Sequence, residues 1–298
     1  MNKIIVVSKH SRDVFVNTEY TGTNEQTGES FELKTITDVN YVNYPVKTFE
    51  ELPALDLELE YDTNFLCVAQ WGPRKNMHNL VRWFVEEFRD EEVGLVLKTS
   101  LAKNSLIDRE MCDGSIKKIL YSIENRDDIK CKVYLLHGDM TDEEMHSLYS
   151  HDKVSAFVSI PHGEGYGLPL FEAAYSGLPV VAPGWSGQLD FLVDENGKDK
   201  FYNVSYDLNN IQKECVWDGV LTAESMWCYP REESFKTKIR ACLDDLKSNS
   251  GIAASSVEYS DSLRTRFSEE ELYSQFVESL GLEIDSEWAE SISQIEIL

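Results

Sequence analysis

The chain has 298 residues, of which 42% are hydrophobic and 27% charged, ordinary values for a globular protein with a substantial core. Its 28 basic and 53 acidic residues give a formal net charge of −25, and such a surface repels nucleic-acid phosphates and anionic lipid headgroups. No apolar run approaches the roughly 18 residues of a membrane-spanning helix, and the apolar run at 4–8 is shorter than that of a signal peptide. We therefore expect a cytoplasmic protein that binds neither nucleic acid nor a membrane.

The cysteines are scattered along the chain. None forms a C-x-x-C pair or a spacing typical of metal ligands, so we interpret all of them as reduced thiols. They are Cys67, Cys112, Cys131, Cys215, Cys228 and Cys242.

The first sixty residues have an irregular pattern. IIVVS followed by KHSRDVFVNT predicts one strand and one short helix, and a polar stretch then runs from about 19 to 62. Six carboxylates and no Lys or Arg lie between Glu50 and Asp62, a composition that suits an acidic linker or a strand at the rim of a sheet.

From about residue 62 onward, short apolar runs alternate with amphipathic stretches, the pattern of parallel strands joined by crossover helices. The predicted strands are 64–70, 93–98, 131–136, 154–160, 179–182 and 201–206. The predicted helices are 76–89, 108–124, 141–150, 169–176, 232–247 and 268–280. Because these strands are apolar throughout, helices should cover both of their faces. The sequence therefore predicts an α/β fold with a doubly wound parallel sheet.

The C-terminal segment 267–298 contains nine carboxylates and no basic residue. Ser268 with Glu271 three residues later is a capping-box pattern that predicts the start of a helix there. We expect part of this segment to pack as a helix and the remainder to stay solvated.

A glycine-rich turn between a predicted strand and a predicted helix is the most informative segment. It lies in IPHGEGYGLPLFEAAYSGLPVVAP, with glycines at 163, 165 and 167. Exposed N–H groups where a helix begins are a ready site for phosphate or carboxylate oxygens. Glu164 lies inside this loop and Glu172 in the first turns of the helix, and phosphate would repel both, so their expected role is to accept hydrogen bonds from hydroxyls. Together these features indicate a ligand with both sugar and phosphate.

Two other interpretations of these glycines stay open. A dinucleotide-binding fingerprint needs a third small residue where Leu168 stands, so the match to a nicotinamide site is weak. Alternatively, the segment is a plain strand-to-helix turn in which Glu172 favours the positive end of the helix dipole.

A second segment favours the ligand. In WGPRKNMHNL, Arg74 and Lys75 stand at the entry to a helix, in a chain that is otherwise strongly acidic. They form a solvated pair if they stand alone. In a doubly wound sheet, however, ligands bind at the carboxyl ends of the strands, which is where both this loop and the glycine loop are expected. Two cations and a set of N–H groups would then flank one diphosphate.

Three segments together carry a resemblance to a known family: GPRKN, GEGYGLPLFEAAYSGLPVVAP and RTRFSEEELYSQF. Over about residues 62–281 the chain closely resembles the C-terminal, donor-binding half of retaining glycosyltransferases of the GT-B fold, the group 1, family 4-like or glycogen-synthase-like superfamily. The opening IIVVSKHSRDVF is similar to the last strand and helix of the N-terminal domain of such enzymes. The resemblance thus implies a Rossmann-like nucleotide-sugar-binding domain at 62–281, preceded by a domain remnant and acidic linker at 1–61 and followed by an acidic tail at 282–298.

The resemblance also implies roles for individual residues. Glu164 matches the glutamate beside the donor sugar, and Glu172 the one that binds the ribose hydroxyls. Lys75 matches the lysine that holds the donor diphosphate. The loop residues match the phosphate and sugar contacts; they are Gly163, Gly165, Tyr166, Gly167 and Leu168.

Two departures from the family are evident. Gln70 stands where members often carry an arginine, a place that Arg74 is positioned to fill. Most of the N-terminal domain, which supplies one wall of the cleft and binds the acceptor, is missing from this sequence. The resemblance therefore implies that a separate N-terminal domain or a second copy of the chain completes the site.

The activity implied is transfer of a sugar from a nucleoside-diphosphate sugar to an acceptor hydroxyl, with retention of the anomeric configuration. Arg74, Lys75 and the loop amides would stabilise charge on the departing diphosphate. The chain has no D-x-D sequence that would hold a metal, so we expect a metal-independent site with no cofactor besides the donor. The alternative is a non-catalytic nucleotide-sugar-binding module, and the sequence does not identify the donor's base and sugar or the acceptor.

Overall fold

The computed structural model describes residues 3–124 and 128–281. The chain divides into two compact units, Met1–Lys47 with Arg264–Leu298, and a larger unit of Thr48–Leu263. The predicted domain boundaries at residues 61 and 281 stay a prediction, and the tail at 282–298 lies outside the described residues.

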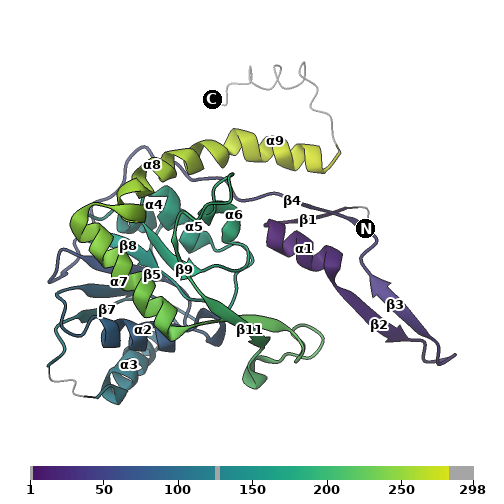
Figure 1. Ribbon diagram of the computed structural model, residues 1–298, viewed down its shortest axis with the longest axis horizontal. Helices are drawn as coiled ribbons and strands as arrows, with labels where there is room; N and C mark the ends of the chain where they lie inside the picture. The colour runs from purple at the N-terminus through teal and green to yellow at the C-terminus, as the bar shows by residue number, and fades with distance from the viewer. Residues whose placement is uncertain (1–2, 125–127, 282–298) are drawn as a thin grey trace. The chain divides into compact units, whose positions relative to one another are not determined.

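The larger unit contains a six-stranded parallel sheet (Figure 1). Its strands are β5 (Asn64–Val68), β6 (Gly94–Lys98), β7 (Lys132–Leu136), β8 (Val154–Val158), β9 (Val180–Pro183) and β10 (Tyr202–Val204). In space the order is β10-β9-β8-β5-β6-β7, so the chain runs outward from β5 to one edge and then from β8 to the other. This is the doubly wound arrangement, with its topological switch point between β5 and β8. The fold predicted from the sequence is confirmed.

Helices cover both faces of this sheet. Helix α2 (Met77–Glu87) contacts α3 (Leu106–Ser122) and α7 (Glu232–Ser248). Helix α5 (Leu168–Tyr175) contacts α4 (Asp142–Tyr149) and the short α6 (Leu189–Leu192). The strands between the two layers are buried because they have no solvent-facing side. In β5, for example, Phe65, Leu66 and Cys67 are at most 1% exposed.

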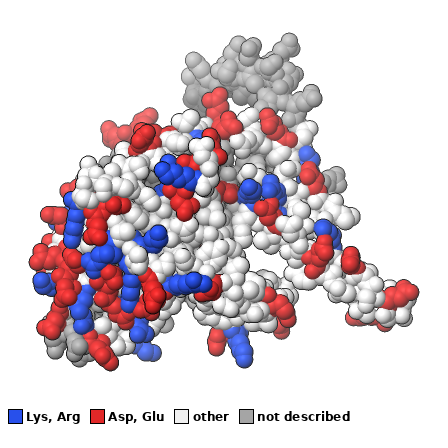
Figure 2. Space-filling model, viewed as in Figure 1, with Lys and Arg blue, Asp and Glu red and all other residues white. Residues whose placement is uncertain are grey.

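Many basic side chains of this unit form ion pairs with acidic ones. Between α2, the loop that follows it and α7, Arg240 pairs with Glu87 at 2.8 Å and with Glu91 at 2.7 Å, and Lys236 pairs with Glu86 at 2.8 Å. Figure 2 shows basic and acidic side chains intermingled, without a continuous basic surface on the face in view. This distribution agrees with the expectation from composition that the chain lacks a nucleic-acid-binding face.

A hairpin follows the sheet. Strands β11 (Tyr206–Asn210) and β12 (Met226–Pro230) pair antiparallel, and the loop between them contains the 3-10 helix η3 (Lys213–Cys215). Cys228 in β12 donates its backbone N–H to the carbonyl of His162 at 3.0 Å. This hydrogen bond attaches the hairpin to the segment that leaves β8.

In the smaller unit, strand β1 (Lys3–Val6) pairs in parallel with β4 (Asp38–Tyr41), and helix α1 (Lys9–Asn17) connects β1 to a hairpin. The strand and helix expected at the N-terminus are therefore present. The hairpin consists of β2 (Glu19–Thr23) and β3 (Ser30–Lys34), which the polar composition of this region did not predict. Helix α9 (Glu269–Ser279) begins at Ser268, as its capping pattern indicated, because the Ser268 hydroxyl accepts the N–H of Glu271. Helix α8 (Gly251–Arg266) connects the two units along the chain and was not predicted.

All six cysteines have free thiols. No helix in the described ranges combines the length and apolar character needed to cross a bilayer.

Candidate functional site

The two loops singled out from the sequence leave the carboxyl ends of β5 and β8, the neighbouring strands at the switch point. After β5 the chain forms the 3-10 helix η1 (Pro73–Lys75) and enters α2 through Asn76, which has a left-handed φ of 55°. The Asn76 side chain donates to the carbonyl of Ile160 at 3.2 Å. The N–H of His162 donates to the carbonyl of Arg74 at 2.7 Å. These hydrogen bonds hold the two loops together.

Arg74, Lys75 and Glu164 form one charged cluster. The Lys75 ammonium lies 2.5 Å from Glu164 Oε1, and the Arg74 guanidinium lies 2.9 Å from Oε2. Arg74 also donates to the carbonyl of Gly163. The exposed fractions of the side chains are 44% for Arg74, 17% for Lys75 and 9% for Glu164, so the ion pair with Lys75 is largely shielded from water. The prediction that Lys75 and Glu164 lie at the same sheet edge is confirmed.

The glycine loop enters α5 through Gly167, which caps the helix with a left-handed φ of 95° that favours glycine. Leu168 is the first residue of α5 and is 42% exposed. Tyr166 is 3% exposed and packs against Phe171 and Phe191, with ring centroids 5.3 and 5.0 Å away. Tyr166 therefore anchors the loop in the core, while its neighbours shape the edge of the sheet.

A second loop, residues 184–188, supports the glycine loop from below. The Ser186 hydroxyl accepts the N–H of Glu164 at 2.9 Å and donates to Gln188 at 2.8 Å. The N–H of Gly187 donates to the carbonyl of Glu164 at 3.1 Å. A Cβ at position 187 would lie 2.1 Å from the carbonyl oxygen of Gly165, so the two loops meet at a distance that glycine permits. The backbone of Glu164 is thus fixed on both sides.

Glu172 lies on α5, and its carboxylate accepts the hydroxyl of Tyr149 at 2.9 Å. Tyr149, the last residue of α4, is fully buried, and burial raises the pKa of its phenol well above the usual value, with Glu172 adding to the shift. Tyr149 therefore stays a neutral donor that holds the Glu172 carboxylate.

His162, directly before the glycine loop, has a structural role. It is 2% exposed, its Nδ1 lies 2.6 Å from the carbonyl oxygen of Cys228, and its ring stacks on Trp227 with centroids 5.4 Å apart. Burial lowers its pKa, which favours the neutral imidazole that donates from Nδ1. It fixes the hairpin to the loop.

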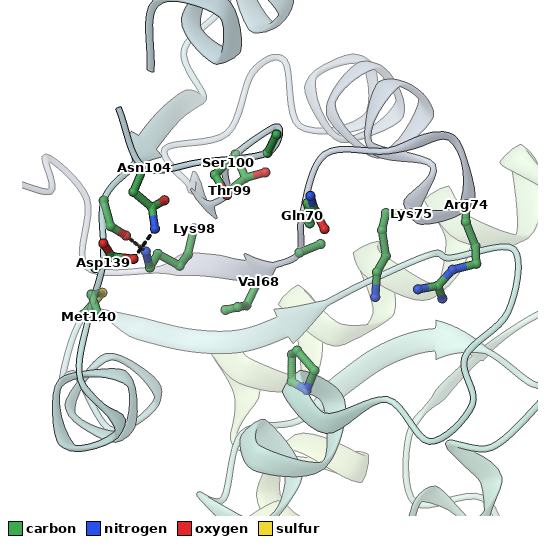
Figure 3. Close-up of a pocket in the computed structure, with 14 residues that line it drawn as sticks. Val68, Gln70, Arg74, Lys75, Lys98, Thr99, Ser100, Asn104, Asp139 and Met140 are labelled. Carbon is green, nitrogen blue, oxygen red and sulfur yellow. Dashed lines mark hydrogen bonds between the residues drawn. The ribbon is translucent and has the colours of Figure 1, made fainter. Parts of the chain in front are cut away.

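A pocket of about 610 Å³ opens beside Arg74 and Lys75 (Figure 3). Its walls come from the carboxyl ends of β5, β6 and β7 and from the start of α5. The lining residues are Val68, Ala69, Gln70, Arg74, Lys75, Lys98, Thr99, Ser100, Ala102, Asn104, Gly138, Asp139, Met140 and Pro169. Figure 3 shows Arg74 and Lys75 at one end and Lys98, Asn104 and Asp139 at the other. The pocket and the charged cluster thus form one continuous site.

The polar residues at the far end of the pocket were missed from the sequence. Lys98 is the last residue of β6 and Asp139 follows β7 by three positions. A charged residue directly after a buried strand is the signal that would have found them. Gln70, at the position where a cation was expected, donates to the carbonyl of Leu101 at 2.8 Å and so supports the loop after β6.

That loop is also held by a buried carboxylate. Asp108 accepts the backbone N–H groups of Leu101, Ala102 and Lys103 at 2.8–3.0 Å and lies 2.9 Å from Nε2 of His137. With the thiol of Cys112 it forms the group of potential metal ligands found among the described residues. Because N–H donors already occupy both of its oxygens, we interpret Asp108 as a brace for the pocket loops.

Several solved structures have a similar fold. Sucrose-phosphate synthase from Thermosynechococcus elongatus aligns with 93% of this chain and 57% of its own, at a TM-score of 0.57 and 15% identity. The E. coli trehalose-6-phosphate protein with bound UDP-2-fluoro glucose aligns with 95% and 61%, at 0.56 and 10% identity. The GtfA/B complex aligns with 93% and 45%, at 0.54 and 14% identity. No protein-family model and no curated protein matches the sequence.

The chain spans about half the length of these structures, between 45% and 61%. Identities of 10–15% establish similarity of fold. The sheet order, the helices on both faces and these alignments agree with the fold implied by the sequence motifs. The chain therefore has the fold of the GT-B glycosyltransferases and resembles their C-terminal half.

Proposed function

We propose that this chain binds a nucleoside-diphosphate sugar and takes part in transfer of the sugar to an acceptor hydroxyl, with retention of the anomeric configuration. The observation that carries the proposal is the meeting of Arg74 and Lys75 with Glu164 at the switch point, at the mouth of the 610 Å³ pocket. Doubly wound folds bind ligands at this place. One of the similar structures, the E. coli trehalose-6-phosphate protein, holds UDP-2-fluoro glucose, which is a nucleotide-sugar analogue.

In this proposal Lys75 and Arg74 hold the donor diphosphate. Negative charge develops on the diphosphate as the sugar leaves, and cations already in place stabilise that charge without reorganisation. Loss of one such donor typically costs about 2.7–4 kcal/mol of transition-state stabilisation. The chain has no D-x-D sequence, so the two cations and the amides of Gly165, Tyr166 and Gly167 are proposed to hold the diphosphate without a metal.

The two glutamates divide the remaining contacts. Glu172, held by Tyr149, is proposed to accept hydrogen bonds from the ribose hydroxyls. Glu164 is proposed to contact the donor sugar once the diphosphate takes over Lys75 and Arg74. The backbone fixed by Ser186 and Gly187 keeps its carboxylate in the right place, and a fixed geometry supplies much of the rate advantage of an enzyme.

A second candidate function follows from the length of the chain, which is about half that of the similar structures. A single unit of this fold binds the donor but lacks a surface that orients the acceptor. In this alternative the chain is a nucleotide-sugar-binding module, and transfer needs a separate N-terminal domain or a second copy of the chain. Helix α1 has an apolar surface available for such a partner, since Val14, Phe15 and Val16 are 41–50% exposed.

Binding and transfer are tested separately. Thermal unfolding of the purified chain with nucleoside diphosphates and their sugar conjugates should show a rise in Tm, because a ligand of the folded state stabilises it by mass action. Lys75→Ala should abolish the rise. Absence of a shift with every nucleotide would refute the proposal. Where binding is present, release of nucleoside diphosphate with an acceptor library distinguishes an active transferase from the binding module.

A further inference from the structure

The far end of the pocket presents three polar side chains in a defined pattern. Asn104 donates from Nδ2 to Oδ1 of Asp139, and Lys98 donates to the carbonyl of Gly138 (Figure 3). Asn104 and Asp139 are exposed and Lys98 is half-buried, and all three line the pocket. They lie opposite the end that contains Arg74 and Lys75.

These contacts leave a specific set of hydrogen-bonding groups for a ligand. An ammonium has three N–H donors and an amide has two, so Lys98 and Asn104 each keep donors beyond the contacts described above. Oδ2 of Asp139 is the acceptor that the Asn104 contact leaves available. This end of the pocket therefore offers a donor, an acceptor and a donor around one carboxylate.

The wall beside this end supplies two further features. Val68 and Ala69 are apolar and suit the face of a planar ring. The hydroxyl of Thr99 is buried, with the residue 4% exposed, and has no hydrogen-bond partner among the described residues. A buried hydroxyl in this state is costly unless a ligand or water reaches it.

We infer that this end of the pocket recognises uracil, so that the donor is a uridine-diphosphate sugar. The edge of uracil presents an acceptor (O4), a donor (N3–H) and an acceptor (O2), which complements Lys98, Asp139 and Asn104 in turn. The inference rests on the proposed function, because it assigns the diphosphate of the same ligand to Arg74 and Lys75.

Other bases fit this pattern less well. Guanine satisfies the first two groups with O6 and N1–H, but its 2-amino group would face the amide donor of Asn104. Cytosine and adenine would direct a ring-nitrogen lone pair at the carboxylate of Asp139. Sites that hydrogen-bond a ligand discriminate against analogues that leave their polar groups unpaired. GDP is therefore the competitor that decides the matter.

The experiment is calorimetric titration of the full chain with UDP, GDP, CDP and ADP. We expect UDP to bind at least about tenfold more tightly than the others, the discrimination of roughly one hydrogen bond to a charged group. Binding of GDP or ADP as tight as that of UDP would overturn the inference and leave the proposed function intact. If none of the four binds to folded protein, the proposed function itself fails.

Two variants test the residue assignment. Asp139→Asn should weaken UDP about tenfold while inorganic diphosphate binds as before, because the carboxylate acceptor is lost at the base and not at the phosphates. Asp152→Asn is the matched control, since it removes the same charge from a side chain that is 87% exposed and does not line the pocket. An unchanged preference for UDP in Asp139→Asn, or an equal loss of diphosphate binding, would overturn the assignment.

Discussion

The carboxylate of Glu164 lies 2.5 Å from the ammonium of Lys75, although the two residues are 89 positions apart in the sequence. The second carboxylate oxygen lies 2.9 Å from the Arg74 guanidinium. The chain thus neutralises with its own carboxylate the two cations that we assign to the donor diphosphate. A diphosphate that binds here has to compete with Glu164.

Replacing Glu164 should therefore separate binding from transfer. Glu164→Gln removes the competing charge, so we expect UDP or inorganic diphosphate to bind more tightly, by a factor on the order of ten. Transfer from the full donor should fall, because the carboxylate that contacts the sugar is gone. Titration calorimetry measures the first effect, and Glu224→Gln, an exposed carboxylate of the same unit, is the control. Weaker diphosphate binding in Glu164→Gln would contradict the competition.

Replacing Glu172 should affect the nucleoside and spare the phosphates. We expect Glu172→Ala to weaken UDP about tenfold and to leave the affinity for inorganic diphosphate unchanged, because the lost acceptor serves the ribose. Tyr149→Phe keeps the carboxylate and removes the phenol that donates to it, so its effect on UDP should be smaller. Equal losses for UDP and inorganic diphosphate would show that Glu172 acts on the phosphates or on the fold.

Substitution at Gly187 should disturb the site through the backbone. A methyl group there would lie 2.1 Å from the carbonyl oxygen of Gly165, so Gly187→Ala should destabilise the fold by about 1–3 kcal/mol and weaken nucleotide binding. Gly114→Ala is the contrasting variant. Gly114 lies inside α3 with nothing within 4 Å of its added Cβ, so alanine there should stabilise the protein by about 0.5–1 kcal/mol. Urea denaturation of the two variants measures both effects, and a neutral Gly187→Ala would refute the close contact.

Asp108 should make stability depend on pH in the acidic range. Backbone N–H groups, above all that of Lys103, together with His137 hold its pKa below the usual value in the folded protein. The unfolded chain then binds a proton that the folded chain does not, so the stabilisation is present above about pH 4 and is lost as the pH falls further. Asp108→Asn should therefore lower the free energy of unfolding at neutral pH, and its difference from the wild type should shrink as the pH falls below 4.

The control for Asp108 lies on the same helix. Asp113 is exposed and pairs with Lys117 at 2.7 Å, so Asp113→Asn should change stability little at any pH. Urea denaturation between pH 7 and pH 3 measures the three proteins side by side. A difference between Asp108→Asn and the wild type that stays constant over this range would contradict the proton linkage.

The sequence by itself determined the fold of the larger unit. All six strands of the sheet and the helices between them were predictable, because uniformly apolar runs such as 64–68 are stable only when covered on both faces. Helix α8 and the β2–β3 hairpin were not. Helix α8 has a weak apolar stripe, with Ser256, Ser260 and Leu263 as its buried residues, and the hairpin lies in a polar stretch without a regular alternation.

The sequence also predicted that Lys75 and Glu164 share one edge of the sheet, since parallel strands end on the same side. Tertiary structure alone decided that the glutamate pairs with both cations, because the ion pair depends on side-chain positions set by Ser186 and Gly187 in a third loop. It also decided that Lys98, Asn104 and Asp139 gather at the far end of the pocket. Each of these residues alone is an ordinary polar residue after a strand, and only the sheet order that places β6 beside β7 brings them together.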